Sequence, residues 1–230
     1  GDPYTKITFK PDYKRFGLDG MTDDLYNIFT KRVYDCALWF SGNMKIELET
    51  KIKEVKTPMS VVLNGEEIVC SLNNYINYYT NGEVEEKDVI IDKMDRWEIG
   101  IVLSKNHKYM QTSMVNGITT IRGGKHVDNV INQIVKKLSE AVLKKKKKVD
   151  IKSSYVKDNI WIFIKCIIEE PTFDGQTKES MTTNISNFGS KCEISEKFIE
   201  KLIKIGLLER IYNTIDLENS RLGKKTDGTK

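Results

Sequence analysis

The residues best equipped for chemistry form a polar loop directly after the most apolar run of the chain. The loop reads Pro171-Thr172-Phe173-Asp174-Gly175-Gln176-Thr177-Lys178-Glu179-Ser180-Met181. It places an amide, a hydroxyl and an ammonium next to one another on Gln176, Thr177 and Lys178, and such groups commonly bind an anion such as phosphate. Lysine is also a default surface residue, so these residue types alone equally allow a solvated loop without chemistry.

Two elements are predicted to position this loop. Residues 160–168 are rich in β-branched and aromatic side chains, which predicts a buried strand that ends before Pro171. Apolar residues recur at helical spacing from Val127 to Val142, which predicts a helix over 127–144 that begins after the Gly123-Gly124 turn. This turn is better explained as a structural start of the helix than as an anion site, and His126 as a capping or packing histidine.

The first 70 residues predict a strand, a helix and a hairpin. Residues 5–10 alternate like a strand, Thr22 can cap a helix, and Asn64-Gly65 is a strong hairpin signal. One apolar stripe of the helix is expected to pack on a core and comprises Leu25, Ile28, Phe29, Val33, Cys36, Ala37 and Phe40.

The rest of the chain predicts a second set of elements. Apolar residues at helical spacing predict a helix from Leu72 to Tyr79, and strands over 97–103 and 109–115 are expected to pair as a hairpin. Ser195 can cap a last helix that is expected to continue through Gly206 to Ile215.

Composition argues against several kinds of site. The chain of 230 residues has two histidines and four widely spaced cysteines, a pattern without metal-ligand spacing or a hydrolytic triad. We expect Cys36, Cys70, Cys166 and Cys192 to be mostly buried free thiols in a reducing compartment. No apolar run reaches membrane-spanning length and no signal peptide is seen, so a soluble intracellular protein, or a piece of one, without a membrane partner is expected. The three tryptophans, Trp39, Trp97 and Trp161, are expected in the core.

A run of five lysines follows the long predicted helix and comprises Lys144, Lys145, Lys146, Lys147 and Lys148. Five ammonium groups could neutralise phosphates of DNA in a way that depends on salt and not on sequence. A solvated connector is the competing interpretation, and the net charge of +4 is too small to decide between them.

Four blocks spread along nearly the whole chain carry a family resemblance. The first is Tyr4-Thr5-Lys6-Ile7-Thr8-Phe9-Lys10-Pro11-Asp12, and the second joins Ser113-Met114-Val115-Asn116-Gly117 to Arg122-Gly123-Gly124-Lys125-His126-Val127-Asp128. The third runs from Trp161 to Met181, and the fourth joins Asn187-Phe188-Gly189-Ser190-Lys191-Cys192 to Ser195-Glu196-Lys197-Phe198-Ile199. In this order they resemble eukaryotic type IIA DNA topoisomerases, where a strand leads through a Pro-Thr-Phe turn into a Gln-Thr-Lys loop.

The resemblance implies an α+β fold. Residues 1–70 would be the C-terminal strand-helix-hairpin part of a GHKL ATPase domain, 71–222 a transducer domain, and 223–230 a polar tail that is frayed or begins a longer helix. The transducer would have a ribosomal-protein-like fold, in which the helix over 127–144 packs on a mixed sheet and connects strands by a left-handed βαβ crossover.

The resemblance also implies roles for particular residues. Lys178, as the catalytic residue, would contact the terminal phosphate of ATP, Gln176 would help to hold that phosphate, and the five lysines would face DNA. The parent would be a nuclear, homodimeric isomerase that uses ATP and Mg²⁺ and couples ATP hydrolysis to closure of its N-terminal gate during DNA passage.

In the family, the catalytic base, the magnesium-holding asparagine and the phosphate lid all precede the Tyr4 block. The chain alone is therefore expected neither to hydrolyse ATP nor to cleave DNA, and no cofactor is expected on it alone.

Two alternatives stay open on the sequence. The chain could be a non-enzymatic, basic nucleic-acid-binding module of ribosomal-protein fold, in which Lys178 would be dispensable. It could also be the equivalent domain pair of another GHKL ATPase, such as a mismatch-repair protein or a chaperone.

Overall fold

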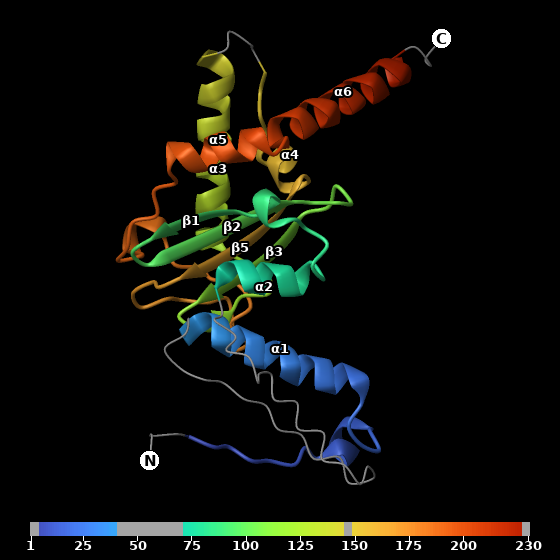
Figure 1. Cartoon of the computed structure of the whole chain (residues 1–230), viewed down its shortest axis with the longest axis vertical. Coiled ribbons are helices and arrows are strands. Elements are labelled where there is room, and N and C mark those ends of the chain that lie inside the picture. The colour runs from blue at the N-terminus through green and yellow to red at the C-terminus, as the bar shows by residue number, and fades with distance from the viewer. Residues whose placement is uncertain (1–4, 41–70, 145–148, 227–230) are drawn as a thin grey trace. The chain divides into compact units, whose positions relative to one another are not determined.

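A computed structural model describes residues 5–40, 71–144 and 149–226 (Figure 1). The chain divides into two compact units, Gly1–Val69 and Cys70–Lys230, and each unit is described by itself. Within the described ranges, no helix is both long and apolar enough to span a membrane.

The first unit contains one long helix. A 3-10 turn, η1 (Tyr13–Phe16), precedes α1 (Asp23–Phe40). The Thr22 hydroxyl accepts a hydrogen bond from the Leu25 amide at 3.3 Å, which confirms the predicted cap. The strand predicted over 5–10 is wrong, because the described residues 5–10 form no regular secondary structure, and alternation in the sequence makes a strand only where the backbone pairs along a neighbour.

The apolar stripe of α1 is only partly covered. Phe29 packs edge-on against Phe9 with ring centroids 5.7 Å apart, but Ile28, Cys36 and Phe40 are exposed. The prediction that this stripe packs on a core is wrong at these three positions, whose side chains are exposed because the contacts described for the stripe, such as Phe9 on Phe29, cover other parts of it. The predicted Asn64-Gly65 hairpin and Cys70 lie outside the described residues.

The second unit is built on a mixed five-stranded sheet in the order β1-β2-β5-β3-β4. Its strands are β1 (Ile90–Met94), β2 (Trp97–Leu103), β3 (Met110–Val115), β4 (Ile118–Thr119) and β5 (Ile160–Cys166). β5 pairs antiparallel with β2 and parallel with β3, so the chain between β3 and β5 is a crossover that contains α3 (Lys125–Lys144). The expected α+β fold with a mixed sheet is confirmed, and the left hand of the crossover stays an expectation.

The predicted pairing of β2 with β3 is wrong. These two strands are consecutive in the sequence, but β5 lies between them and pairs with both. The connection wraps around the start of β5, where Ser104 N donates to Asn159 O at 2.9 Å. Neighbouring strands are about 4.8 Å apart, so six residues can easily span the width of an inserted strand.

A genuine hairpin joins β3 to β4 at Asn116-Gly117. Both residues have a left-handed backbone, with φ of 51° and 79°. This is the conformation that a two-residue hairpin turn requires and that Asn-Gly provides. The sequence contains this signal, but β4 is only two residues long and was not predicted, and neither was β1.

The two faces of the sheet bury different side chains. On one face, Ile99, Ile101, Ile162 and Ile164 join the core formed with the apolar side of α3. On the opposite face lies α2 (Leu72–Tyr79) (Figure 1). It is so close to the sheet that a Cβ on Gly100 would be 2.5 Å from Ile76 Cδ1. The helix predicted over 127–144 therefore packs on the sheet as expected, and it begins two residues earlier.

Two helices, and not one, follow the predicted Ser195 cap. Ser195 Oγ accepts from the Phe198 amide at 3.1 Å and begins α5 (Glu196–Lys204). Gly206 then adopts a left-handed φ of 97°, which interrupts the helix before α6 (Leu207–Thr226). The expected continuation through Gly206 is wrong. The residues assigned to the tail are helical as far as Thr226.

Buried thiols occur in the second unit only, as far as the structure describes the chain. Cys166 and Cys192 are buried, and burial raises the pKa of the Cys192 thiol to about 12. Cys36 is exposed, so the prediction of burial is wrong for this residue. Trp97 is fully buried as predicted, whereas Trp39 and Trp161 are partly exposed.

Candidate functional site

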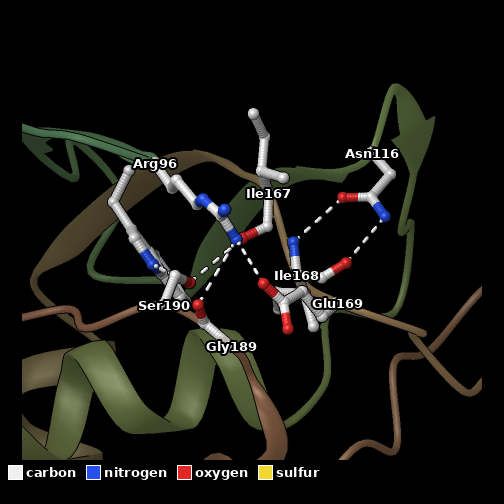
Figure 2. A network of polar contacts seen from close by, with 8 residues as sticks. Arg96, Asn116, Ile167, Ile168, Glu169, Gly189 and Ser190 are labelled. Carbon is white, nitrogen blue, oxygen red and sulfur yellow. Dashed lines mark hydrogen bonds and ion pairs between the residues drawn. The ribbon is translucent and has the colours of Figure 1, made fainter.

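The polar loop begins just beyond the end of β5. Its start is anchored by hydrogen bonds to the backbone of three successive residues, 167–169 (Figure 2). Ile167 N donates to Arg96 O at 2.9 Å, and Glu169 N donates to Phe188 O at 3.0 Å. Between them, the Asn116 amide pairs with both backbone groups of Ile168, at 2.9 Å to the N–H and 2.8 Å to the carbonyl. The chain is thus held like a strand for three residues beyond β5.

The block 187–192 supports the same place. Ser190 Oγ accepts from Trp97 Nε1 at 2.9 Å and donates to Ile167 O at 3.1 Å (Figure 2). Arg96 Nη1 binds Glu169 Oε1 at 2.8 Å and Gly189 O at 3.3 Å. Gly189 has a φ of 65°, and a Cβ there would lie 2.2 Å from Glu169 Cδ. The block is therefore a scaffold for the root of the loop.

The loop itself is a narrow hairpin-like excursion. Thr182 N donates to Thr172 O at 2.8 Å, and Asp174 N donates to Ser180 O at 3.1 Å, so the two limbs are joined near their base. Ser180 N also donates to Asp174 Oδ1 at 3.1 Å. These contacts leave the five residues 175–179 to form the tip.

The tip carries the predicted site residues. Gln176 and Thr177 are exposed, and neither side chain makes a hydrogen bond within the described ranges. Lys178 N donates to Gly175 O at 3.0 Å, which closes a turn and gives Lys178 a left-handed φ of 56°. The Lys178 ammonium lies 5.6 Å from the centroid of the Phe173 ring and has no carboxylate partner among the described residues.

The limb that follows the tip docks on the turn that starts α3. Arg122 N donates to Glu179 O at 2.9 Å, Met181 N to Gly123 O at 3.0 Å, and Lys125 N to Met181 O at 3.0 Å. Gly124 has a φ of 132°, and a Cβ there would be 2.2 Å from Met181 O. Only glycine permits such a close approach of the two backbones, so the loop and the start of α3 form one packed piece.

Arg122 adds side-chain contacts to both limbs of the loop. Its Nη2 pairs with Asp174 Oδ2, and its Nε lies 3.1 Å from Glu179 Oε2. Sequence reasoning missed this role, because Arg122 is 52 residues away from Asp174 along the chain. The only signal was that Arg122 and the loop both fall within the resembling blocks.

The turn at Gly123-Gly124 does not offer an anion site of its own. The amides of Val127 and Asp128 donate to Gly124 O at 2.9 and 3.1 Å, and that of Lys125 is taken by Met181. The structural interpretation of this turn is therefore supported.

His126 is a packing histidine and not an exposed acid or base. Its ring is fully buried, and Nε2 lies 3.3 Å from Thr120 Oγ1. Nδ1 has no hydrogen-bond partner within the described residues. Burial lowers the pKa of His126 to about 3, so the ring is neutral at physiological pH.

The lysine run lies at the other end of α3. Lys144 is the last residue of this helix and is exposed, while Lys145, Lys146, Lys147 and Lys148 lie outside the described residues. A helix of 20 residues is about 30 Å long. The structure therefore does not bring Lys144 and Lys178 together; it places them at opposite ends of one helix.

A polar cleft opens at the foot of the loop. Its lining is made of carboxylates, hydroxyls and amides, from Glu169, Glu170, Thr172, Thr182, Thr183, Asn184 and Asn187. In the parts of the chain that the structure describes, no cluster of three or more histidine, cysteine or acidic residues could hold a metal ion.

Comparisons with known proteins agree with this architecture. The sequence profile of the DNA gyrase B family matches residues 71–227, more than half of the chain. "DNA topoisomerase 2" of Arabidopsis thaliana is 37% identical over 234 residues, which are 99% of this chain but 15% of that protein. "Probable DNA topoisomerase 2" of Dictyostelium discoideum is 41% identical over 97% of this chain and 14% of its own length. The chain thus spans about one seventh of these relatives.

Solved structures show the same relationship. The ATPase region of Saccharomyces cerevisiae topoisomerase II has a TM-score of 0.65 at 32% identity, covering 88% of this chain and 48% of that one. The ATPase and transducer domains of DNA topoisomerase II from Balamuthia mandrillaris have a TM-score of 0.69 at 28% identity, covering 91% and 49%.

The fold and the docked loop therefore define a class: an α+β region of the kind found in the ATPase and transducer portions of type II topoisomerases. The chain belongs to the DNA gyrase B family, and the relatives compared above are eukaryotic type II enzymes.

Proposed function

We propose that this chain is the transducer region, with the C-terminal end of the GHKL domain, of an ATP-dependent type II DNA topoisomerase. In this role it couples ATP binding and hydrolysis to closure of the N-terminal gate and passage of double-stranded DNA. Residues 1–70 would belong to the ATPase domain and 71–222 to the transducer. The parent would be a nuclear homodimer with isomerase activity.

The observation that carries the proposal is the state of Lys178. Its ammonium lies at the tip of a loop whose base is held by backbone hydrogen bonds. No carboxylate of the described residues pairs with this ammonium. The contact with the Phe173 ring is worth about 0.5–1 kcal/mol at an exposed site, so a phosphate oxygen can readily replace it. An ammonium held in this way can form an ion pair with an anion that arrives from another domain.

The chemistry proposed for the loop is electrostatic. ATP supplies the phosphoryl group, and the Lys178 ammonium would stabilise the negative charge on the terminal phosphate and the further charge of the transition state. The Gln176 amide, exposed two residues earlier, would donate a hydrogen bond to the same phosphate. Magnesium would be held by the upstream ATP-binding residues of the parent.

Loss of the phosphate links this chemistry to motion. Once the terminal phosphate leaves, Lys178 and Gln176 lose their partner and the loop is released from the nucleotide. The loop is joined to the start of α3 by three backbone hydrogen bonds, so it would carry this end of the helix with it. The proposal therefore connects hydrolysis to rotation of the transducer.

The experiment is to join this chain to the upstream ATP-binding part of the S. cerevisiae relative and to measure ATP turnover. Lys178→Ala is expected to lower kcat/KM at least tenfold, which corresponds to about 1.4 kcal/mol of transition-state stabilisation. Lys204→Ala, on the exposed surface of α5, is the matched control and should leave turnover unchanged. A loss well under tenfold for Lys178→Ala would contradict the phosphate contact and favour the nucleic-acid-binding module.

A further inference from the structure

Lys178 is flanked by two carboxylates that could capture its ammonium. Asp174 lies four residues before it, and Glu179 is the next residue. The ammonium lies over the ring of Phe173, the neighbour of Asp174. If either carboxylate were free, an ion pair with Lys178 would compete with binding of a phosphate.

The structure shows why this capture does not take place. Arg122 forms an ion pair with each of the two carboxylates. Its Nη2 contacts Asp174 Oδ2, and its Nε lies 3.1 Å from Glu179 Oε2. The planar guanidinium presents several donors at fixed directions, so one arginine can satisfy two acceptors on different limbs. The backbone N–H of the same residue also donates to Glu179 O at 2.9 Å, which fixes the side chain beside the loop.

The Arg122 side chain contributes little else to the stability of the fold. Its side chain is 61% exposed, so it fills no part of the core. Exposed ion pairs typically contribute 0–1 kcal/mol to stability, so about that little is expected from each pair here. The limbs of the loop are joined independently through Thr172, Thr182, Asp174 and Ser180. The side chain therefore acts mainly on the charges around the tip.

We propose that Arg122 is a positioning residue that binds Asp174 and Glu179 and thereby leaves the Lys178 ammonium available to a phosphate. The inference rests on the proposed function of Lys178. Arg122 does not touch the phosphate itself; it acts through the lysine by removing the lysine's local competitors.

The test uses the same fusion to the ATP-binding part of the S. cerevisiae relative. Arg122→Gln removes the charge at similar length and is expected to lower kcat/KM for ATP about fivefold, with most of the effect in KM. Arg122→Lys keeps the charge but satisfies one carboxylate at a time, so about half of the loss on a logarithmic scale is expected to return. Lys105→Gln is the matched control, because Lys105 is an exposed cation paired with Glu83 at the opposite end of the sheet from the loop.

Two combinations distinguish positioning from a purely structural role. In the Lys178→Ala background, Arg122→Gln is expected to change kcat/KM less than about twofold, because its effect passes through Lys178. Adding Asp174→Asn and Glu179→Gln to Arg122→Gln is expected to restore activity, since the competing charges are gone. Asn retains an Oδ1 acceptor for the Ser180 amide.

The remaining outcomes separate a failure of the Arg122 inference from a failure of the proposed function of Lys178. If Lys178→Ala lowers turnover and Arg122→Gln does not, the inference fails while the proposed function stands. If Lys178→Ala itself has no effect, the proposed function fails, and the inference fails with it. A lowered thermal unfolding midpoint for Arg122→Gln, with a loss of activity that neutralising the carboxylates fails to restore, would show a structural role and overturn the inference.

Discussion

At the scale of single residues, the lysines differ in the partners of their ammonium groups. Lys125 donates to Asn184, and Lys137 pairs with Glu196. Lys178 has a neighbouring ring instead of a carboxylate, although Glu179 is the next residue. A lysine that keeps its donors free beside a turn is what an anion site on an exposed loop requires. In the proposed arrangement, the charge of Lys178 stays available because Arg122, which is remote in sequence, binds Asp174 and Glu179.

His126 gives a prediction for the dependence of stability on pH. Burial lowers its pKa to about 3 in the folded protein, whereas an unfolded histidine titrates near 6.5. The unfolded state therefore binds a proton first, and the contribution of the neutral ring is complete above pH 6.5 and is lost as pH falls toward 3. The free energy of unfolding should drop by about 2 kcal/mol between pH 7 and 5, measured with urea.

The variant that tests this prediction is His126→Gln. His126→Gln should flatten the dependence on pH over this range, because the titrating group is gone. An unchanged slope in His126→Gln would show that other groups cause the loss at low pH.

At the scale of elements, the root of the loop is more ordered than the sequence suggests. The predicted strand over 160–168 ends two residues earlier in the structure, at Cys166, yet the next three residues remain hydrogen bonded on both sides (Figure 2). Asn116, from the β3–β4 turn, supplies the donor and acceptor that a neighbouring strand would otherwise provide. A rigid root limits the freedom of the tip, which lowers the entropy cost of holding an anion.

Asn116→Ala should therefore destabilise the second unit. It removes two hydrogen bonds, at 2.8 and 2.9 Å, and places alanine at a φ of 51°. We expect a loss of about 2–3 kcal/mol in the free energy of unfolding, from bonds worth about 1 kcal/mol each plus backbone strain. Urea unfolding followed by circular dichroism measures it.

Two comparisons make the Asn116 prediction specific. Asn116→Asp keeps the acceptor for the Ile168 amide and tolerates the left-handed backbone, so about half of the loss should return. Asn213→Ala, on the exposed face of α6, should change stability by less than about 0.5 kcal/mol. Equal effects of Asn116→Ala and Asn213→Ala would refute the anchoring role.

At the scale of the whole molecule, α3 links two functional candidates. Its N-terminal turn is bonded to the loop that carries Lys178, and its C-terminus carries Lys144, the first residue of the lysine run. Seven of its residues are buried in the second unit, so the helix is expected to move as a rigid body with the sheet. If the loop moves on release of phosphate as proposed, the displacement would then reach the Lys144 end of α3 through the helix itself.

The lysine run gives a prediction for coupling to DNA. Replacing Lys144, Lys145, Lys146, Lys147 and Lys148 by alanine in the fusion enzyme should lower the ratio of DNA-stimulated to basal ATP turnover. Stimulation should also become less sensitive to salt, because fewer counterions are released from DNA. The measurement is ATP turnover with and without duplex DNA over a series of salt concentrations.

A second set of lysines serves as the control for this charge effect. Lys197, Lys201 and Lys204 are exposed on α5, and replacing them by alanine removes positive charge from the same unit. This triple variant should keep the stimulation ratio. If both variants lower the ratio in proportion to the charge removed, the run has no special placement and the solvated-connector interpretation is favoured.

Local sequence signals predicted much of the second unit. The apolar spacing from Val127 to Val142 predicted α3, and Ser195 predicted the start of α5, because both signals act within a few residues. The pairing of β2 with β3 was wrong, because adjacency in sequence favours a hairpin while burial of the apolar β5 on both faces favours the centre of the sheet. The break at Gly206 was underestimated, because glycine tolerates a helix but also permits the left-handed conformation found there.

For the candidate site, the sequence by itself determined which groups are present: the amide of Gln176, the ammonium of Lys178 and the apolar strand that precedes them. Only the tertiary structure decided that the Lys178 ammonium lies over the Phe173 ring, without a carboxylate partner among the described residues. Arg122 reaches Asp174 from 52 residues away, and Asn116 reaches Ile168 across the same separation. Residue type and local spacing define what a side chain can do, but its partners depend on which distant segments the sheet and α3 bring together.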